Sequence, residues 1–151
     1  MSKAKPTIPD HWLNLAAQIP YELPLPHDAN GRLETRESLA RVYSEECARI
    51  ELLEGSYRSD PFIPIPGAVL DEYRKYRPTP FCRAYGLERR LNYAGQIYFK
   101  REDTNPTGSH KPNTAIPQAY YAQCQGLREL VTDTGAGQWG AALGLDRKSV
   151  V

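Results

Sequence analysis

The sequence predicts an α/β protein built from two parts, a proline-rich and helical N-terminal arm over residues 1–76 and an α/β domain over residues 77–151. Two observations support this prediction. Most of the 13 prolines lie before residue 81, so the first half favours extended chain and short helices. In the second half, segments with strand and helix patterns alternate, as they do in parallel sheets covered by helices.

Composition and charge exclude several classes of protein. The chain has 151 residues, enough for one domain with its own core, and its 19 basic and 18 acidic residues give no field that favours nucleic acid or an anionic membrane. No apolar run approaches the roughly 20 residues of a membrane span, and the first ten residues lack the apolar core of a secretory signal. Cys47, Cys82 and Cys124 lie far apart without metal-ligand spacing, which predicts reduced thiols in a cytoplasmic protein without a metal site.

The N-terminal arm is expected to be a scaffold that wraps around the rest of the chain. Five prolines between residues 6 and 30 exclude a long helix there and favour extended chain. Residues 35–55 place apolar side chains on one helical face, with Thr35 as the N-cap and Gly55 at the end, so one helix is predicted. The remaining segments of the arm are expected to be a loop over residues 56–66 and a short helix over residues 67–76.

The second half has the pattern of a parallel β-α-β unit. Residues 96–102 and 128–134 are rich in β-forming side chains and are predicted to be strands. Between them, residues 112–125 are apolar and aromatic at helical spacing, and a further helix is predicted to begin in the glycine-rich stretch from residue 135. Ligands of open parallel sheets bind beyond the carboxyl ends of the strands. Two segments are therefore expected to lie together at one sheet edge: TNPTGSHKPN (104–113) and DTGAGQWG (133–140).

The first of these segments places Lys111 at the start of a predicted helix. A helix N-terminus has partial positive charge, which disfavours an ammonium ion and lowers the proton affinity of a nearby amine. A neutral amine is what imine formation with an aldehyde requires. The alternative interpretation is an ordinary exposed loop lysine. Pro117 interrupts the hydrogen-bond ladder of the same helix and is expected to free the carbonyl of Asn113, and local exceptions of this kind tend to occur near functional sites.

The second segment has the features of an anion pocket. Gly135, Ala136 and Gly137 leave the backbone uncovered where a helix begins, so its N–H groups are open to a carboxylate or a phosphate. The alternative is a tight strand-to-helix turn that uses glycine for its dihedral freedom alone. Asp133, just before this turn, is either an acid–base group or a plain helix cap.

Four motifs, in order and at matching separations, resemble the tryptophan synthase beta chain family. They are RPTPF (77–81), IYFKRED (97–103), TGSHKPNTA (107–115) and TDTGAGQWG (132–140). The likeness is loose over the proline-rich arm and strong over residues 77–143. HKPNTA, the aromatic run QAYYAQ and Trp139 after GAGQ point to the divergent beta-like branch of that family. The resemblance implies a pyridoxal phosphate enzyme of fold type II, a lyase that condenses L-serine with indole to give L-tryptophan and water.

The same resemblance implies roles for individual residues. Lys111 matches the lysine that forms the internal Schiff base and removes the α-proton of serine, and His110 matches a histidine beside the cofactor phosphate. Asn113 matches an asparagine near the ring hydroxyl of the cofactor. Asp133 falls on the catalytic glutamate of the family and is one methylene shorter. The substrate carboxylate is expected on the backbone N–H groups of the loop formed by Thr134, Gly135, Ala136, Gly137, Gln138 and Trp139.

The resemblance also implies partners and an extent. It implies small-molecule substrates, a homodimer in the full-length family and, in main-branch members, an alpha chain, whereas no nucleic acid or membrane partner is expected. Chains of the family are much longer, and the last residues, DRKSVV, depart from its pattern, so an inactive N-terminal fragment with the first β-α-β unit is expected. Two hypotheses stay open, the lysine-bearing part of a tryptophan synthase beta-type enzyme and a non-catalytic remnant. Threonine synthase and serine dehydratase are the alternative chemistries of fold type II.

Overall fold

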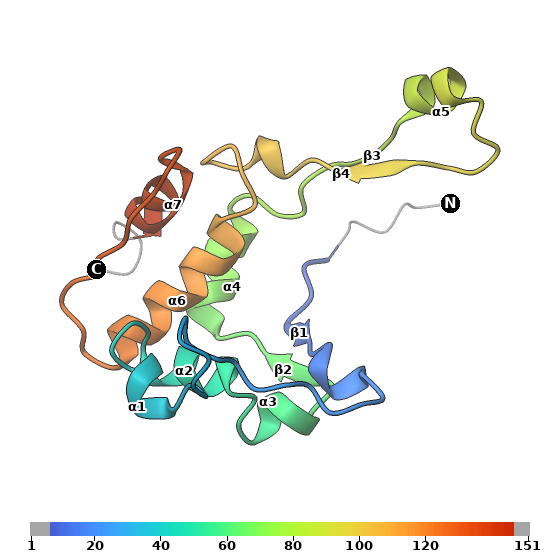
Figure 1. Cartoon of the computed structure of the whole chain (residues 1–151). Coiled ribbons are helices and arrows are strands. Elements are labelled where there is room, and N and C mark those ends of the chain that lie inside the picture. The colour runs from blue at the N-terminus through green and yellow to red at the C-terminus, as the bar shows by residue number, and fades with distance from the viewer. Residues whose placement is uncertain (1–6, 147–151) are drawn as a thin grey trace.

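The computed structural model describes residues 7–146 and shows short helices and two small sheets arranged around one longer helix (Figure 1). No helix in this part of the chain has the length and apolarity that a membrane crossing requires. The elements follow in chain order as β1 (His11–Leu13), η1 (Ala16–Gln18), α1 (Arg36–Leu39), α2 (Glu45–Glu51), α3 (Ser56–Ser59), β2 (Phe62–Pro64), α4 (Gly67–Arg74), β3 (Phe81–Arg83), α5 (Tyr85–Leu91), β4 (Tyr98–Lys100), η2 (Glu102–Thr104), α6 (Pro112–Cys124) and α7 (Gln138–Asp146).

The predicted single helix over residues 35–55 is wrong, because the chain forms two helices there. Thr35 caps α1 as predicted, in a capping box with Ser38. The chain then leaves the helix, and Ser44 begins α2 by accepting a hydrogen bond from the backbone N–H of Cys47. Serine favours such a cap over a helix interior because its hydroxyl competes for backbone groups. The predicted loop over residues 56–66 likewise contains α3 and β2.

The three other segments that were predicted as helices are confirmed, one in the N-terminal arm and two in the second half. Residues 67–76 contain α4, residues 112–125 contain α6, and the stretch after residue 135 contains α7. The strand predicted over residues 96–102 is also confirmed, in the shorter form of β4. Strand β4 belongs to a separate extension, formed by β3, α5 and β4, that projects from the rest of the chain in Figure 1.

The predicted parallel β-α-β unit is wrong for the described residues. β4 pairs antiparallel with β3, with Phe99 opposite Cys82, and β1 pairs antiparallel with β2. Residues 128–134, the second strand of the prediction, form no strand. A parallel strand needs a neighbour for its backbone groups and cover on both faces. Residues 128–134 are exposed, and the side chain of Val131 is 93% exposed, so neither condition is met within residues 7–146.

The main core joins α4 to α6. Val69 and Tyr73 of α4 are each 1% exposed, and they pack with Ile65 and with Ile116 of α6. Trp12, next to β2 in the first sheet, packs against the same cluster. Full burial of a large apolar side chain contributes about 1.5–3 kcal/mol, so this cluster holds the first turns of α6 firmly against α4. The core therefore positions the segment that begins at Lys111.

Candidate functional site

Lys111 is the N-cap residue of α6, and Pro112 occupies the first turn of the helix. Proline suits this place because its fixed φ matches the helix and its missing N–H has no partner to lose. Pro112 is among the most deeply buried side chains, whereas the side chain of Lys111 is half-buried. The prediction that Lys111 lies at a helix N-terminus is thus confirmed, and the buried Pro112 fixes the backbone next to Lys111.

The loop before Lys111 is held by Asn105, a buried residue that was not among the predicted site residues. The Oδ1 atom of Asn105 accepts hydrogen bonds from the backbone N–H groups of Thr107, at 3.1 Å, and of Ser109, at 3.3 Å. Its Nδ2 atom donates to the carbonyl of Ser109. Gly108 has a φ of 67°, which favours glycine. The available signal was an asparagine followed by proline, a pair typical of turns.

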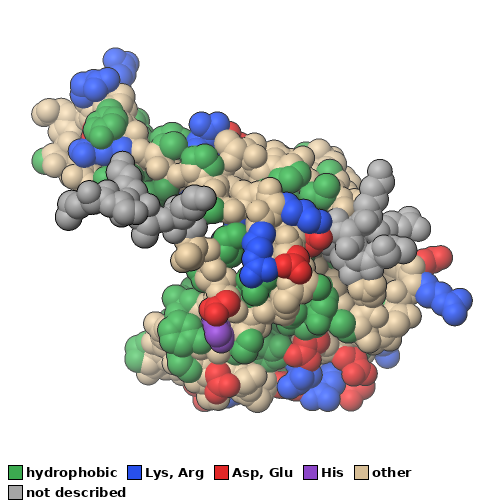
Figure 2. Space-filling view, turned by 180° about the vertical axis from the view of Figure 1, so that it is seen from behind, with side chains coloured by type: hydrophobic (Ala, Val, Ile, Leu, Met, Phe, Trp, Pro, Cys, Tyr) green, Lys and Arg blue, Asp and Glu red, His purple; other side chains and the backbone are tan. Residues whose placement is uncertain are grey.

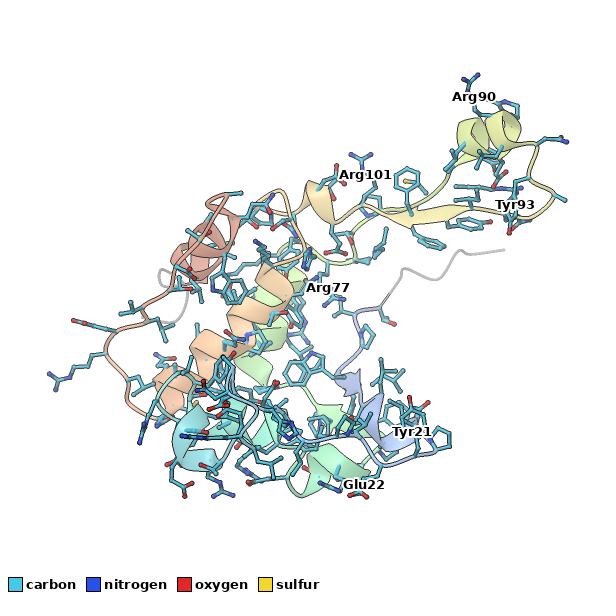
Figure 3. The ribbon with its side chains drawn as sticks, viewed as in Figure 1. Tyr21, Glu22, Arg77, Arg90, Tyr93 and Arg101 are labelled. Carbon is cyan, nitrogen blue, oxygen red and sulfur yellow. The ribbon has the colours of Figure 1, made fainter. Side chains whose placement is uncertain are left out.

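The carbonyl of Asn113 is free of the helix ladder, as predicted. Pro117 lies inside α6 and has no N–H to donate to that carbonyl. The hydroxyl of Tyr73 in α4 donates to it instead, at 2.6 Å. The guanidinium of Arg77, labelled in Figure 3, lies over the ring of Tyr73, 4.9 Å from its centroid. The carbonyl that Pro117 leaves without a helical partner therefore bonds to Tyr73 and links the first turn of α6 to α4.

The carboxamide of Asn113 belongs to a chain of hydrogen bonds that we call the Asn113 network, formed by Tyr76, Thr79, Glu102 and Asn113. The hydroxyl of Tyr76 donates to Oδ1 of Asn113 at 2.8 Å. Nδ2 of Asn113 donates to Oε2 of Glu102 at 2.9 Å. The hydroxyl of Thr79, which is buried, donates to Oε1 of Glu102 at 2.6 Å. Local sequence patterns give no sign of these partners of Asn113, since only the fold brings three separate segments together here.

Ionisation in the network follows from burial and charge. Desolvation acts to raise the pKa of Glu102, but the hydrogen bonds from Thr79 and Asn113, with the charges of Arg77 and Lys100, outweigh it and hold this pKa below its usual value. Burial raises the pKa of Tyr76, and the carboxylate of Glu102 adds to that rise. Glu102 is therefore an ionised acceptor and Tyr76 a protonated donor at neutral pH.

The glycine-rich segment leads into α7. Gly137 has a φ of 80°, which favours glycine, and α7 begins at the next residue. The first turn of a helix leaves N–H groups without intrahelical partners, and residues 134–138 are exposed, so these groups are open to an anion. Asp133 is exposed and lies before the N-terminus of α7, too far along the chain to be its cap.

The structure brings some of the predicted site residues together and leaves others separate. Lys111 and Asn113 share the first turn of α6, and His110, which is exposed, directly precedes it. α7 contacts α6, so the segment over residues 133–139 leads to a helix that packs on the lysine-bearing helix. Within residues 7–146, no hydrogen bond or ion pair joins His110 or Lys111 to that segment.

A hollow of about 500 Å³ lies on another side of α6. Asn113, Thr114 and Pro117 line it from α6, and Trp12 and Tyr57 line it from the N-terminal arm. Lys111 and the glycine-rich segment do not line this hollow. It is mainly apolar, and Asn113 is the predicted site residue that lines it within the described part of the chain.

Comparison with known proteins gives the family. The sequence profile of pyridoxal-phosphate dependent enzymes matches residues 73–145, which include Lys111 and the glycine-rich segment. Tryptophan synthase beta chain 2 of Thermotoga maritima is 47% identical over 136 residues. Over residues 73–145, the chain is thus similar to the pyridoxal-phosphate dependent enzymes. Members of this family depend on pyridoxal phosphate, as the resemblance of the four motifs implied.

Other similar members of the family are also tryptophan synthase beta chains. Tryptophan synthase beta chain 2 of Methanothermobacter thermautotrophicus is 48% identical over 139 residues, and the beta chain of Fervidobacterium nodosum is 47% identical over 136 residues. The matches cover 90–91% of this chain. They cover 31–32% of the relatives, so the chain spans about a third of the length of these proteins.

The residues at the start of α6 fit the cofactor of this family. A half-buried primary amine stands at a helix N-terminus, and an exposed imidazole lies next to it at His110. Asn113 offers an amide that is hydrogen-bonded to Tyr76 and Glu102. The first turn of α7 adds backbone N–H groups that suit a carboxylate or phosphate. This set of groups matches an anionic aldehyde with a polar ring oxygen.

Proposed function

We propose that the chain is the lysine-bearing part of a tryptophan synthase beta-type lyase, which condenses L-serine with indole to give L-tryptophan and water. The observation that supports this most is the position of Lys111 as N-cap of α6, in a chain 47–48% identical to tryptophan synthase beta chains. An acyl or phosphoryl transfer site would need a different set of groups, with a nucleophile beside a base. The free thiols of Cys47, Cys82 and Cys124 agree with a cytoplasmic enzyme.

In this proposal, each predicted site residue has a defined role. Pyridoxal phosphate, when bound, supplies an electron sink for the α-carbon of the amino acid. The amine of Lys111 would hold the aldehyde of the cofactor and later move the α-proton. His110 lies beside the phosphate, Asn113 donates to the ring oxygen, and the N–H groups of residues 134–139 hold the carboxylate of serine.

Asp133 is proposed as the acidic group that faces indole. Positive charge develops on the indole nitrogen as its ring carbon attacks, and a carboxylate close to that nitrogen stabilises it electrostatically. Asp133 is exposed, so its carboxylate is open to a ligand. Its side chain is about 1.5 Å shorter than the glutamate that the family uses, so its reach limits the rate of this step.

The test uses a completed chain, which we define as residues 1–145 fused to the remaining length of the Thermotoga maritima relative. Pyridoxal phosphate is added, the protein is reduced with borohydride, and the modified lysines are mapped by mass spectrometry. We expect stoichiometric labelling of Lys111 and formation of tryptophan from serine and indole. Lys111→Ala should remove both the label and the visible absorbance of the bound cofactor.

Lys100→Ala is the matched control, because Lys100 lies at the end of a neighbouring element and donates to the carbonyl of Thr79. It should keep the label at Lys111. Loss of the absorbance band in the Lys100 variant, with the band kept in Lys111→Ala, would overturn the assignment. Labelling of Lys111 without tryptophan, but with threonine or pyruvate formed from the corresponding substrates, would favour threonine synthase or serine dehydratase chemistry.

A further inference from the structure

The ionised carboxylate of Glu102 can only accept hydrogen bonds, and this restricts the direction of the neighbouring Asn113 carboxamide. Both carboxylate oxygens are occupied by donors, Oε1 by the hydroxyl of Thr79 at 2.6 Å and Oε2 by Nδ2 of Asn113 at 2.9 Å. If the carboxamide of Asn113 turned over, its carbonyl oxygen would face the carboxylate, and two acceptors would repel each other. The carboxamide therefore has one favourable direction.

Tyr76 cannot set that direction by itself. A phenolic hydroxyl both donates and accepts, so it can pair with either end of a carboxamide. The hydroxyl of Tyr76 donates to Oδ1 of Asn113 at 2.8 Å, because Nδ2 of Asn113 donates to Glu102 and Oδ1 is the end that remains for Tyr76. Thr79 contacts Glu102 and makes no hydrogen bond to Asn113 in the described part of the chain, so it orients the carboxylate alone.

We propose that Glu102 is a positioning residue that sets the polarity of the Asn113 carboxamide. It holds Nδ2 toward itself and so leaves the second N–H of Asn113, a hydrogen-bond donor, for a ligand at the first turn of α6. The ligand class is an anionic oxygen on a ring. This inference deepens the proposed function and rests on it where that oxygen is taken to belong to pyridoxal phosphate.

The first experiment tests the polarity without any cofactor. In the ¹⁵N-labelled 151-residue chain, the side-chain amide protons of Asn113 are observed by NMR and assigned by their loss in Asn113→Asp. A proton bonded to a carboxylate is shifted downfield, and we expect one such proton. Glu102→Gln should abolish this shift, because its own amide can donate and allows the carboxamide of Asn113 to turn over.

Two variants separate polarity from simple disruption of the network. Tyr76→Phe removes the donor at the other end but leaves the acceptor, so the downfield proton should persist. Asp103→Asn removes the neighbouring carboxylate, which is paired with Arg101 rather than with Asn113, and should change nothing at Asn113. The same spectrum in Glu102→Gln as in the unchanged chain would overturn the proposal.

The second experiment uses the completed chain and two cofactors, pyridoxal phosphate and its 3-deoxy analogue, which lacks the ring oxygen. Glu102→Gln should weaken binding of pyridoxal phosphate on the order of tenfold and leave binding of the analogue unchanged. Equal weakening for both would show a merely structural role and overturn the proposal. Absence of any cofactor at Lys111 in the unchanged completed chain would overturn the proposed function instead, and the NMR result would then decide the polarity of Asn113 independently.

Discussion

Asn113 shows how a single side chain at the start of α6 acquires its direction from distant segments. Tyr76 follows α4 and Glu102 begins η2, and both reach the carboxamide of Asn113. Asn113 was predicted as a site residue from its place in a motif, but the sequence contained no sign of these partners. Hydrogen bonds between segments far apart in the chain depend on packing, so local sequence patterns do not predict them.

The ionisation of Glu102 predicts a pH dependence of stability. Its pKa is lower in the folded chain than in the unfolded chain, so its contribution is complete above the unfolded pKa and is lost as the pH falls through the folded pKa. Glu102→Gln should therefore unfold a few degrees lower than the unchanged chain at pH 7, with the gap closing as the pH falls below the usual pKa of a glutamate. Thermal unfolding followed by circular dichroism at several pH values measures this gap. A gap of constant size across the pH range would contradict the prediction.

Asp133 gives a prediction about rate. In the completed chain, Asp133→Glu should raise the rate of indole addition, because it restores about 1.5 Å of reach toward the indole nitrogen. Single-turnover formation of tryptophan measures the effect, and Asp133→Asn is the control that keeps the length and removes the charge. An unchanged or lower rate in Asp133→Glu would show that the local backbone already compensates for the shorter side chain.

The attachment of α6 to α4 depends on an exception within the helix. Pro117 leaves the carbonyl of Asn113 without a helical partner, and Tyr73 supplies the missing donor from a fully buried position. Burial raises the pKa of Tyr73, so its hydroxyl keeps the proton that it donates. A proline that would weaken an isolated helix thus creates a hydrogen bond between two helices.

A double-mutant cycle tests this coupling. Tyr73→Phe should destabilise the chain by about 1–3 kcal/mol, because the carbonyl of Asn113 loses its partner in a buried place. In a Pro117→Ala background, an N–H at residue 117 can bond to that carbonyl, so the same change should cost less. Urea unfolding of the four proteins gives the coupling energy. Additive effects would mean that the two residues act independently.

The whole molecule leaves a large apolar surface uncovered. On the extension formed by β3, α5 and β4, the side chains of Phe81 and Leu91 are 68% and 60% exposed, and Figure 2 shows hydrophobic side chains along the face seen from behind. Figure 3 places Arg90 and Tyr93 at the far end of this extension and Arg101 at its base. An exposed apolar surface of this extent is typical of a face that another segment or another chain covers.

For the 151-residue chain by itself, we expect no tryptophan synthesis and no stoichiometric labelling at Lys111. In the described residues, no hydrogen bond joins the groups at the start of α6 to the segment over residues 133–139. A phosphate with nearly two negative charges needs several convergent donors. Borohydride reduction with pyridoxal phosphate, followed by peptide mapping, tests this expectation. Labelling confined to Lys111, together with tryptophan from serine and indole, would show that the chain is a working enzyme.

The sequence by itself determined the helices α4, α6 and α7, the position of Lys111 at a helix N-terminus, the freed carbonyl of Asn113 and the family. These features depend on neighbours in the chain, on proline and glycine geometry, or on motif order, all of which a sequence contains. Only the tertiary structure decided that Tyr73 pairs with that carbonyl, that Asn113 donates a hydrogen bond to Glu102, and that residues 128–134 form no strand. The physical reason is the same in each case, because hydrogen bonds and strand pairs between distant segments exist only where packing brings their partners together.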